Sequence, residues 1–249
     1  MIDCPAPGEA ALLLPVWQVP ANVHGLVSTR SGGVSEGHYA TLNLAQHVND
    51  DPALVAANRQ RLQDLAGLAG QPLWLQQVHG KSVLLADHSA APVTGAAPQA
   101  DAAYASAPGR VLAIMVADCL PILLCSRDGK EIAAIHAGWR GLAENIIAET
   151  IGHFSSTDIT AWLGPAIGPC HYEVDGPLKR NFTGEQGFSK GRDAAHWMLD
   201  LGAIARQQLA DSGVGVVEGG DVCTFCDQRF FSYRRDGETG RFAVFIWRD

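Results

Sequence analysis

Apolar residues that recur every three or four positions predict three helices in this chain. The first predicted helix begins at Asp50–Asp51. The second extends from about Gly141 to Phe154, and the third extends from about Asp200 to Gly213. Pro52 suits the first turn of the first helix, because its φ angle is already helical and its missing N–H needs no partner there. The face that this helix should bury carries Leu54, Val55, Asn58, Leu62 and Leu65.

Eight shorter runs, apolar throughout or alternating, predict β-strands. They are Trp74–Val78, Lys81–Ala86, Val111–Ala117, Leu120–Cys125, Glu131–His136, Ile159–Leu163, Arg229–Arg234 and Arg241–Trp247. Turn residues at Asp128–Gly129 and Asp236–Gly240 predict that the strands flanking each turn form a hairpin. Because such hairpins outnumber helical crossovers, we expect mixed or antiparallel sheets covered by helices, which is an α+β fold.

One segment has the composition of a linker. Ala90–Ala100 is rich in alanine and proline, but it is short enough to be a surface loop. We therefore predict a single domain over residues 1–249.

Composition narrows the class of protein and its partners. A formal net charge of -8 argues against nonspecific binding of nucleic acid, which needs a basic face. The longest apolar runs have the length of strands, so no membrane span is expected. The six cysteines are scattered, and no basic start precedes an apolar segment as in a secretory signal. We expect a cytoplasmic protein without a disulfide framework, either a monomer or a small homo-oligomer.

The predicted hairpin around Asp128–Gly129 brings a thiol and an imidazole together. Paired positions on its two strands sum to about 257, which places His136 opposite Pro121 and diagonal to Cys119. Cys119 and His136 then project from the same face, and diagonal neighbours lie roughly 7–8 Å apart at Cα. A register slip of one residue would move them to opposite faces.

A third candidate side chain comes from another strand end, since His79 closes Trp74–Val78 just before Gly80. Two histidines and one cysteine form a known catalytic zinc set that leaves one position for water or substrate. Two other interpretations stay open from the residues alone. Cys119 could be an ordinary buried thiol beside histidines that bind backbone groups, or it could be a nucleophile with His136 as its base.

Other residues are candidates for binding substrate or for assisting the reaction. Arg30 opens an Arg-Ser-Gly-Gly turn that could hold phosphate, although a plain turn is the alternative. Asn43 could contact substrate or a backbone group, and Arg59 could clamp phosphate or simply be solvated. Asp118, beside the thiol, could orient a ligand or act as a general base. The Cys223–Cys226 pair forms C-x-x-C, but no second pair in the sequence completes a structural zinc site.

Ten segments together resemble the multicopper-oxidase-like laccase-domain family, the YfiH group, also called purine nucleoside phosphorylases of that type. The segments are Ser28–Ser35, Thr41–Leu44, Asn58–Arg59, Trp74–Gly80, Ala117–Pro121, His136–Gly141, Ala161–Pro169, Asp221–Thr224, Phe230–Arg235 and Gly240–Arg241. The resemblance covers the chain from about Ala21 to Trp247, and His-Ala-Gly-Trp-Arg-Gly with Ala-Asp-Cys-Leu-Pro upstream is highly specific. One stretch departs from it, because the family's Gly-x-His-x-Gly-Asp reads Ala45-Gln-His-Val-Asn-Asp50 here.

The resemblance implies two packed mixed β-sheets flanked by helices, with zinc held by His79, Cys119 and His136. It also implies phosphorolysis of adenosine, inosine and methylthioadenosine, and deamination of adenosine, so a small nucleoside and phosphate are the expected partners. Arg30 and Arg59 are then the expected phosphate ligands, and Asp118 the expected proton carrier.

Three alternatives to this function remain. Relatives are also linked to editing of peptidoglycan precursors, which a cysteine or zinc hydrolase would perform. A polyphenol oxidase needs several coppers, yet none of the nine histidines forms a His-x-His pair, and copper would occupy one such site only opportunistically. The last alternative is a non-enzymatic, metal-stabilised binding protein.

Overall fold

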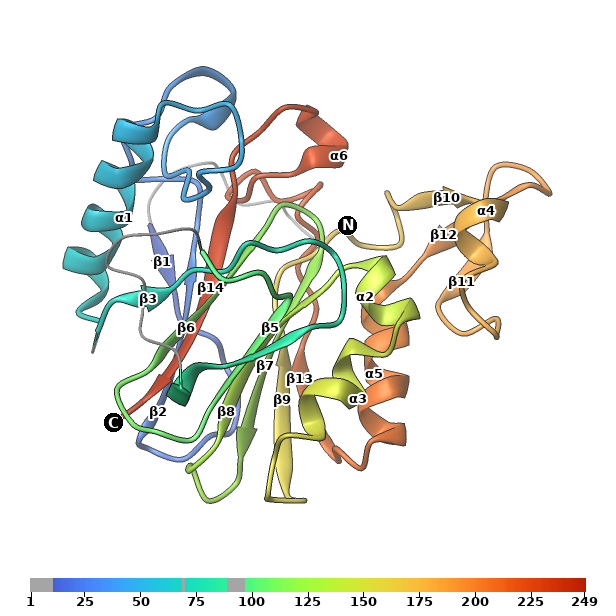
Figure 1. Cartoon of the computed structure of the whole chain (residues 1–249). Helices are drawn as coiled ribbons and strands as arrows, with labels where there is room; N and C mark the ends of the chain where they lie inside the picture. The colour runs from blue at the N-terminus through green and yellow to red at the C-terminus, as the bar shows by residue number, and fades with distance from the viewer. Residues whose placement is uncertain (1–10, 69, 89–96) are drawn as a thin grey trace.

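Two β-sheets pack face to face in the computed structural model, with helices on both outer faces (Figure 1). The structure describes residues 11–68, 70–88 and 97–249. The helices are α1 Pro52–Ala66, α2 Trp139–Ala143, α3 Ile146–Ile151, α4 Gly176–Lys179, α5 Leu201–Asp211 and α6 Tyr233–Asp236, with 3-10 turns at Gly37–Tyr39 and Ala86–His88. The strands are β1 Leu12–Leu13, β2 Val23–Ser28, β3 Pro72–Leu73, β4 Val83–Leu85, β5 Ala102–Ala105, β6 Val111–Val116, β7 Leu120–Ser126, β8 Ile132–Ala137, β9 Ile159–Leu163, β10 Glu173–Asp175, β11 Phe188–Lys190, β12 His196–Leu199, β13 Val216–Gly219 and β14 Phe242–Arg248.

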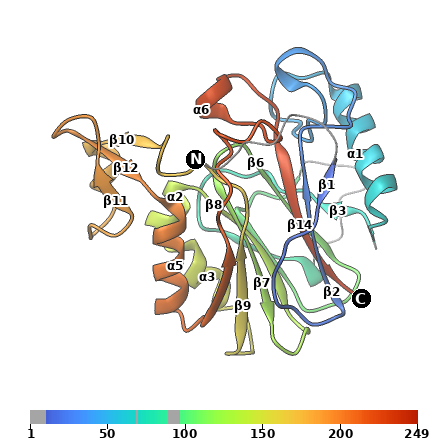
Figure 2. The same cartoon turned by 180° about the vertical axis from the view of Figure 1, so that it is seen from behind.

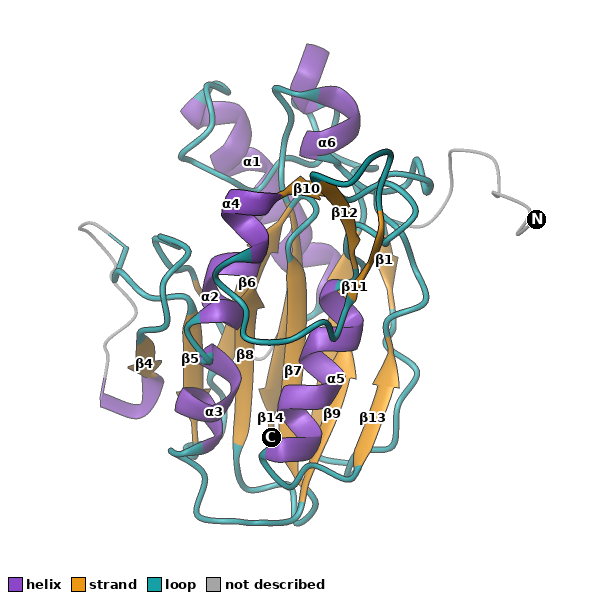
Figure 3. Ribbon diagram, turned by 90° about the vertical axis from the view of Figure 1, so that its right-hand side faces the viewer, coloured by secondary structure: helices purple, strands orange, loops and turns teal. Residues whose placement is uncertain are grey.

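Both large sheets are mixed, which confirms the expected α+β fold with two packed mixed sheets. The five-stranded sheet has the order β1-β2-β14-β6-β3, and the six-stranded sheet, seen face-on in Figure 3, has the order β13-β9-β7-β8-β5-β4. A third, antiparallel sheet of order β10-β12-β11 projects beyond α2 and α5 (Figures 1 and 2).

Three layers of apolar side chains hold the molecule together. Helix α1 covers the outer face of the five-stranded sheet, where Leu62 packs with Met115 and Phe245. The inner faces of the two sheets share a second layer that includes Phe230 and Phe231. Helices α2, α3 and α5 cover the outer face of the six-stranded sheet through the third layer.

The hairpin that places the candidate thiol and imidazole has the predicted register. Pro121 lies opposite His136 in the β7–β8 ladder, so the paired positions sum to 257 as expected. Both strands are fully buried, as their continuous apolar sequence indicated. The fold therefore presents Cys119 and His136 at the same end of neighbouring strands.

Several predicted elements differ from the structure. The helix expected over Gly141–Phe154 is two helices, α2 and α3, because Asn145 has a left-handed backbone with φ of 60°. Leu65, expected on the buried face of α1, is 60% exposed. No strand covers Trp74–Val78, where only an isolated bridge joins Gln76 to Gln99.

The hairpin expected across Asp236–Gly240 is also wrong. Ser232 accepts a hydrogen bond from Arg235 N and begins helix α6, so the segment Arg229–Arg234 is not a strand. Strand β14 pairs instead with β2 and β6. Most of the predicted linker Ala90–Ala100 lies outside the described residues. Among the residues described, none belongs to a helix long and apolar enough to cross a bilayer.

Candidate functional site

Three side chains from separate parts of the chain converge at one end of the six-stranded sheet. His136 comes from β8, Cys119 from the turn just before β7, and His79 from the loop after β3. Their ligand atoms all lie within 4.8 Å of one another, and the two imidazole rings are 4.8 Å apart at their centroids. His136 is buried, Cys119 is partly buried and His79 is exposed, so the group opens toward solvent on one side.

Asp101, which the sequence did not single out, orients two of these residues. Its carboxylate is fully buried and lies 2.8 Å from His136 Nδ1. The same carboxylate accepts hydrogen bonds from the backbone N–H groups of His79 and Gly80 at 2.9 and 2.7 Å. With Nδ1 bound to Asp101, His136 presents Nε2 to the site. In the sequence Asp101 is only an acid between alanines, a pattern too general to mark it as a site residue.

Gly138 leaves room for the cysteine. A Cβ at this position would lie 3.0 Å from Cys119 Sγ and 3.5 Å from His79 Cδ2. The contact with Cys119 Sγ is tighter than ordinary van der Waals packing, whereas the one with His79 Cδ2 is ordinary, so a side chain here would press on the thiol. The glycine in His136-Ala-Gly is thus explained by the site and not by its backbone angles, since φ of -67° suits any residue.

The backbone around the thiol is held by Asp118, whose own φ is 97°. One Asp118 oxygen accepts a hydrogen bond from Thr224 Oγ1 at 2.6 Å, and the other accepts one from Arg234 N at 2.7 Å. Ile167 N donates to the Asp118 carbonyl at 2.9 Å. Asp118 therefore ties the turn before β7 to two other loops.

The local electrostatics favour an ionised thiol. Burial opposes the charge on Cys119, but His136 and His79 outweigh it and lower the pKa of the thiol to about 6. Burial likewise opposes the charge on His136, yet Cys119 and Asp101 raise the pKa of this imidazole to about 9. A thiolate and two imidazoles are a donor set that suits zinc and other thiophilic divalent ions. The three residues thus fit the metal that the resemblance implies.

A cavity of about 480 Å³ opens onto the three side chains. This volume lies within the range usual for sites that bind small molecules. Arg140, Arg234 and Arg241 line it, as do His47 and Asp118. Burial lowers the pKa of His47, and Arg241 adds to the effect, so the neutral form of its imidazole is favoured. The three arginines were not selected as site residues from the sequence, although they lie in segments that carry the resemblance, which are His136–Gly141, Phe230–Arg235 and Gly240–Arg241.

The three predicted substrate contacts occupy other positions. Arg30, Asn43 and Arg59 are not among the described residues that line this cavity. Arg30 Nε donates to Ala40 O at 2.9 Å, and Arg59 Nε donates to Leu44 O at 2.9 Å. Asn43 is fully buried, and its amide contacts Asp50 and the backbone of Ala45. Each of these three side chains thus makes a hydrogen bond to the backbone within residues 40–50.

His47 belongs to that same segment, Ala45–Asp50, where the sequence departs from the family pattern. Asn43 Oδ1 accepts a hydrogen bond from Arg241 N at 2.9 Å, which ties the start of the loop to β14. His47 lines the cavity and matches the family pattern, whereas the departing positions Ala45 and Asn49 are not among the described residues that line it.

The sequence of this chain is similar to a known protein family and to individual bacterial proteins. Residues 24–249 match the family described as multi-copper polyphenol oxidoreductase laccase. Purine nucleoside phosphorylase YfiH of Escherichia coli is 45% identical over 245 residues, which span 95% of this chain and 98% of the relative. Purine nucleoside phosphorylase PA4543 of Pseudomonas aeruginosa is 43% identical over 245 residues, with the same shares of both chains.

Two solved structures share the fold. Protein NMB0706 of Neisseria meningitidis superposes with a TM-score of 0.89 at 41% identity, covering 96% of this chain and 100% of that chain. YlmD of Geobacillus stearothermophilus superposes with a TM-score of 0.84 at 32% identity, covering 92% of each chain.

Proposed function

The chain belongs to the multi-copper polyphenol oxidoreductase laccase family, and we propose that it is a purine nucleoside phosphorylase that depends on a metal held by His79, Cys119 and His136. The observation that carries the proposal is one cavity in which these three side chains lie beside three arginines. Phosphorolysis needs a place for an anion next to a place for the nucleoside, and this cavity offers both. The names of the relatives support the same reaction.

In the proposed reaction an oxygen of inorganic phosphate forms a bond to C1′ of the ribose. The bond between C1′ and the purine nitrogen breaks, and the purine leaves with the electron pair and takes up a proton. Arg241, with Arg140 and Arg234, is placed to hold the phosphate, because guanidinium groups match phosphate oxygens in geometry and charge. Substrate binding by Arg30, Asn43 and Arg59 stays a prediction. These three residues are not among the described residues that line the cavity.

A divalent ion such as zinc, when bound, would supply Lewis acidity beside the reacting centre. The chain's own residues prepare that place. Asp101 fixes the orientation of His136, and Gly138 keeps space beside Cys119. Burial lowers the pKa of His47, which favours a neutral imidazole suited to hydrogen-bond the purine, so the proton that the leaving purine takes up would come from water or from dihydrogen phosphate.

The substrates proposed are adenosine, inosine and methylthioadenosine, as the resemblance implies, with zinc as the metal and a cytoplasmic setting. Deamination of adenosine, in which water adds to C6 of the purine and ammonia leaves, is proposed as a second reaction in the same cavity. It needs a group that moves a proton, and Asp118 lines the cavity. Because both Asp118 oxygens already accept hydrogen bonds, this role requires Asp118 to exchange one of those partners.

The test measures zinc in protein purified without added metal and assays the three nucleosides with and without phosphate. Cys119→Ser and His136→Ala are expected to lose base release by at least about 100-fold, as loss of a metal ligand does. Chelation should have the same effect. Activity that survives both chelation and these substitutions would overturn the metal-dependent proposal, and base release without phosphate would replace phosphorolysis by hydrolysis.

A matched pair of arginine substitutions tests the phosphate site. Arg241→Gln is expected to raise KM for phosphate by about tenfold or more, because one charged hydrogen bond is worth roughly 1.5–3 kcal/mol. Arg61→Gln is the control, since Arg61 lies exposed on α1 and donates a long hydrogen bond of 3.4 Å to Gly32 O. Equal effects of the two substitutions would contradict the assignment.

One observation favours a second candidate function. In space, the His136 imidazole lies between the Cys119 thiol and the Asp101 carboxylate, an arrangement typical of cysteine hydrolases. The pKa of this thiol is lowered to about 6. A hydrolase that edits peptidoglycan precursors would lose activity on alkylation of Cys119 and keep it after chelation. A polyphenol oxidase would require bound copper and dioxygen consumption, and a binding protein would show no turnover. The same purified protein distinguishes these outcomes.

A further inference from the structure

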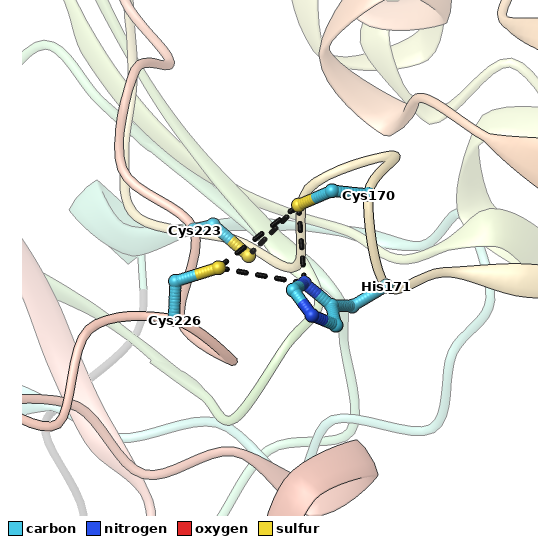
Figure 4. A group of neighbouring side chains, drawn as sticks. All are labelled: Cys170, His171, Cys223 and Cys226. Carbon is cyan, nitrogen blue, oxygen red and sulfur yellow. Dashed lines mark hydrogen bonds between the residues drawn. The ribbon is translucent and has the colours of Figure 1, made fainter. Parts of the chain in front are cut away.

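We propose that Cys170, His171, Cys223 and Cys226 form a second metal site, which binds one zinc-like divalent ion and has a structural role. The four side chains converge from two loops, as Figure 4 shows. Their ligand atoms all lie within 4.8 Å of one another. None of the four is a ligand in the group of His79, Cys119 and His136, so this site goes beyond the proposed function.

The distances match a tetrahedral ion. Cys170 Sγ lies 3.9 Å from Cys223 Sγ and 4.0 Å from Cys226 Sγ. A tetrahedral zinc with bonds of about 2.3 Å to sulfur separates its sulfurs by roughly 3.8 Å. His171 Nδ1 lies 3.1 Å from Cys170 Sγ and 3.4 Å from Cys226 Sγ, where about 3.6 Å is expected for a nitrogen and a sulfur on one zinc. A disulfide would need a separation of about 2.05 Å between two sulfurs.

The surroundings hold these side chains in place. The His171 ring stacks on Phe225, with centroids 3.9 Å apart and planes 14° apart, which fixes the direction of Nδ1. Gly168 N donates to Cys223 Sγ at 3.1 Å, a contact that stabilises a thiolate. A Cβ at Gly168 would lie between 3.2 and 3.4 Å from Cys223 Cβ, Cys223 Sγ and Cys170 Sγ. Gly168 therefore leaves room for two of the sulfurs to approach.

The donor set is that of a closed, structural zinc site. Three cysteines and one histidine fill all four positions with protein ligands and leave none for a substrate. From the sequence alone, Cys223–Cys226 lacked the second pair that such a site needs. The fold supplies it as Cys170-His171, which follows β9 and is brought against the loop after β13 by a backbone bridge between Ala166 and Cys223.

The position of the site gives it a consequence. The two loops that it joins carry Ile167 and Thr224, and both of these residues hold Asp118. Asp118 precedes the thiol Cys119, and Ile167 lines the cavity. An ion at the second site would therefore fix the wall of the cavity and the turn that carries Cys119, without touching a substrate.

Zinc content of the purified full chain tests the inference. We expect about two zinc ions per chain if both sites fill, and the double variant Cys170→Ser/Cys226→Ser should lose one of them. Cys125→Ala is the matched control, because Cys125 is a buried thiol in the layer between the sheets and should leave the content unchanged. His136→Ala should remove the other ion, so failure of either site is seen separately.

Cobalt gives a second readout that does not depend on activity. In a His79→Ala/His136→Ala background, added Co²⁺ should show the absorption of a tetrahedral thiolate site, and Cys223→Ser should abolish it. Should the double serine variant fail to fold, His171→Ala removes one partly exposed ligand and is expected to weaken zinc binding by at least about tenfold. Zinc content unchanged by these substitutions, or a disulfide among the three cysteines in reduced preparations, would overturn the inference.

Discussion

Gly138 shows how much of the site depends on the absence of a side chain. We expect Gly138→Ala to lower metal affinity and activity by at least about tenfold, because the new Cβ would push against Cys119 Sγ. Gly215→Ala is the control, since a Cβ there meets no atom within 4 Å. Metal titration and thermal unfolding of both variants separate a local effect from general destabilisation. Equal metal affinity in the two variants would contradict the role of Gly138.

Asp101 is expected to act through His136. Asp101→Asn should weaken metal binding by about 10–100-fold, because an amide can donate to Nδ1 and so favour the wrong tautomer of the imidazole. Asp87→Asn is the matched control, as Asp87 also accepts hydrogen bonds from backbone N–H groups, at Ser106 and Ala107. If both variants lose stability but only Asp101→Asn loses metal affinity, the role in orientation is supported. Equal metal affinities would contradict it.

At this scale the sequence predicted the residues that converge but not those that support them. Cys119 and His136 were found because the position of a hairpin turn determines which residues of its two strands pair. That register is confirmed. Asp101 was missed because its partners His79 and His136 come from distant segments. Arg30 and Arg59 were chosen over Arg241, although all three lie in segments of the resemblance, because the sequence does not show which side chains form the wall of a cavity.

The break between α2 and α3 is a property of one backbone position. Asn145 is left-handed and its side chain makes no capping hydrogen bond, so its identity matters for backbone strain alone. We expect Asn145→Ala to lower the free energy of unfolding by about 1 kcal/mol, whereas Asn145→Gly should stay within about 0.5 kcal/mol. Chemical denaturation measures both, with Glu144→Ala as an exposed neighbour whose φ is -92°. An equal loss for alanine and glycine would contradict the explanation by strain.

The 3-10 turn Ala86–His88 is fastened to the end of β5 by a carboxylate whose contribution depends on pH. Burial opposes the charge of Asp87, but hydrogen bonds from Ser106 and Ala107 lower its pKa below the ordinary value. Since the folded pKa is the lower one, this stabilisation is present above the unfolded pKa and is lost as pH falls through the folded pKa. Asp87→Asn should cost about 1–2 kcal/mol at pH 7 and less at pH 3. Urea unfolding at both values checks this, and a difference independent of pH would contradict it.

Whole elements were predictable where burial alone determines them. Strands β6, β7, β8, β9 and β14 fall where continuous apolar runs predicted them, since strands between two layers need no polar face. The segments Trp74–Val78 and Arg229–Arg234 failed because alternation does not show whether a partner strand exists. Gln77 fills that place beside β6, where its side chain donates to Met115 O and accepts from Met115 N.

The two large sheets are interleaved along the chain, which bears on how the molecule unfolds. Strands β5 and β7 belong to the six-stranded sheet, whereas β6 between them and β14 near the C-terminus belong to the five-stranded sheet. We expect β6, β14, β7 and β9 to lose hydrogen-exchange protection at one denaturant concentration, as a single domain would. Phe230→Ala should lower that concentration for both sheets together, at a cost of about 3–5 kcal/mol. Separate transitions for the two sheets would contradict the single-domain prediction.

The arginines around the cavity have a kinetic consequence for a chain of net charge -8. The outer surface repels polyanions at long range, while Arg140, Arg234 and Arg241 create a local attraction that a small anion meets only at close approach. Added salt shortens the range of that attraction, to about 8 Å at 0.15 M ionic strength. The capture rate of phosphate, measured as kcat/KM, should therefore fall with salt while that of an uncharged nucleoside stays constant. The molecule would in this way select anions by size, because its negative surface repels large polyanions while the arginines of the cavity attract small anions.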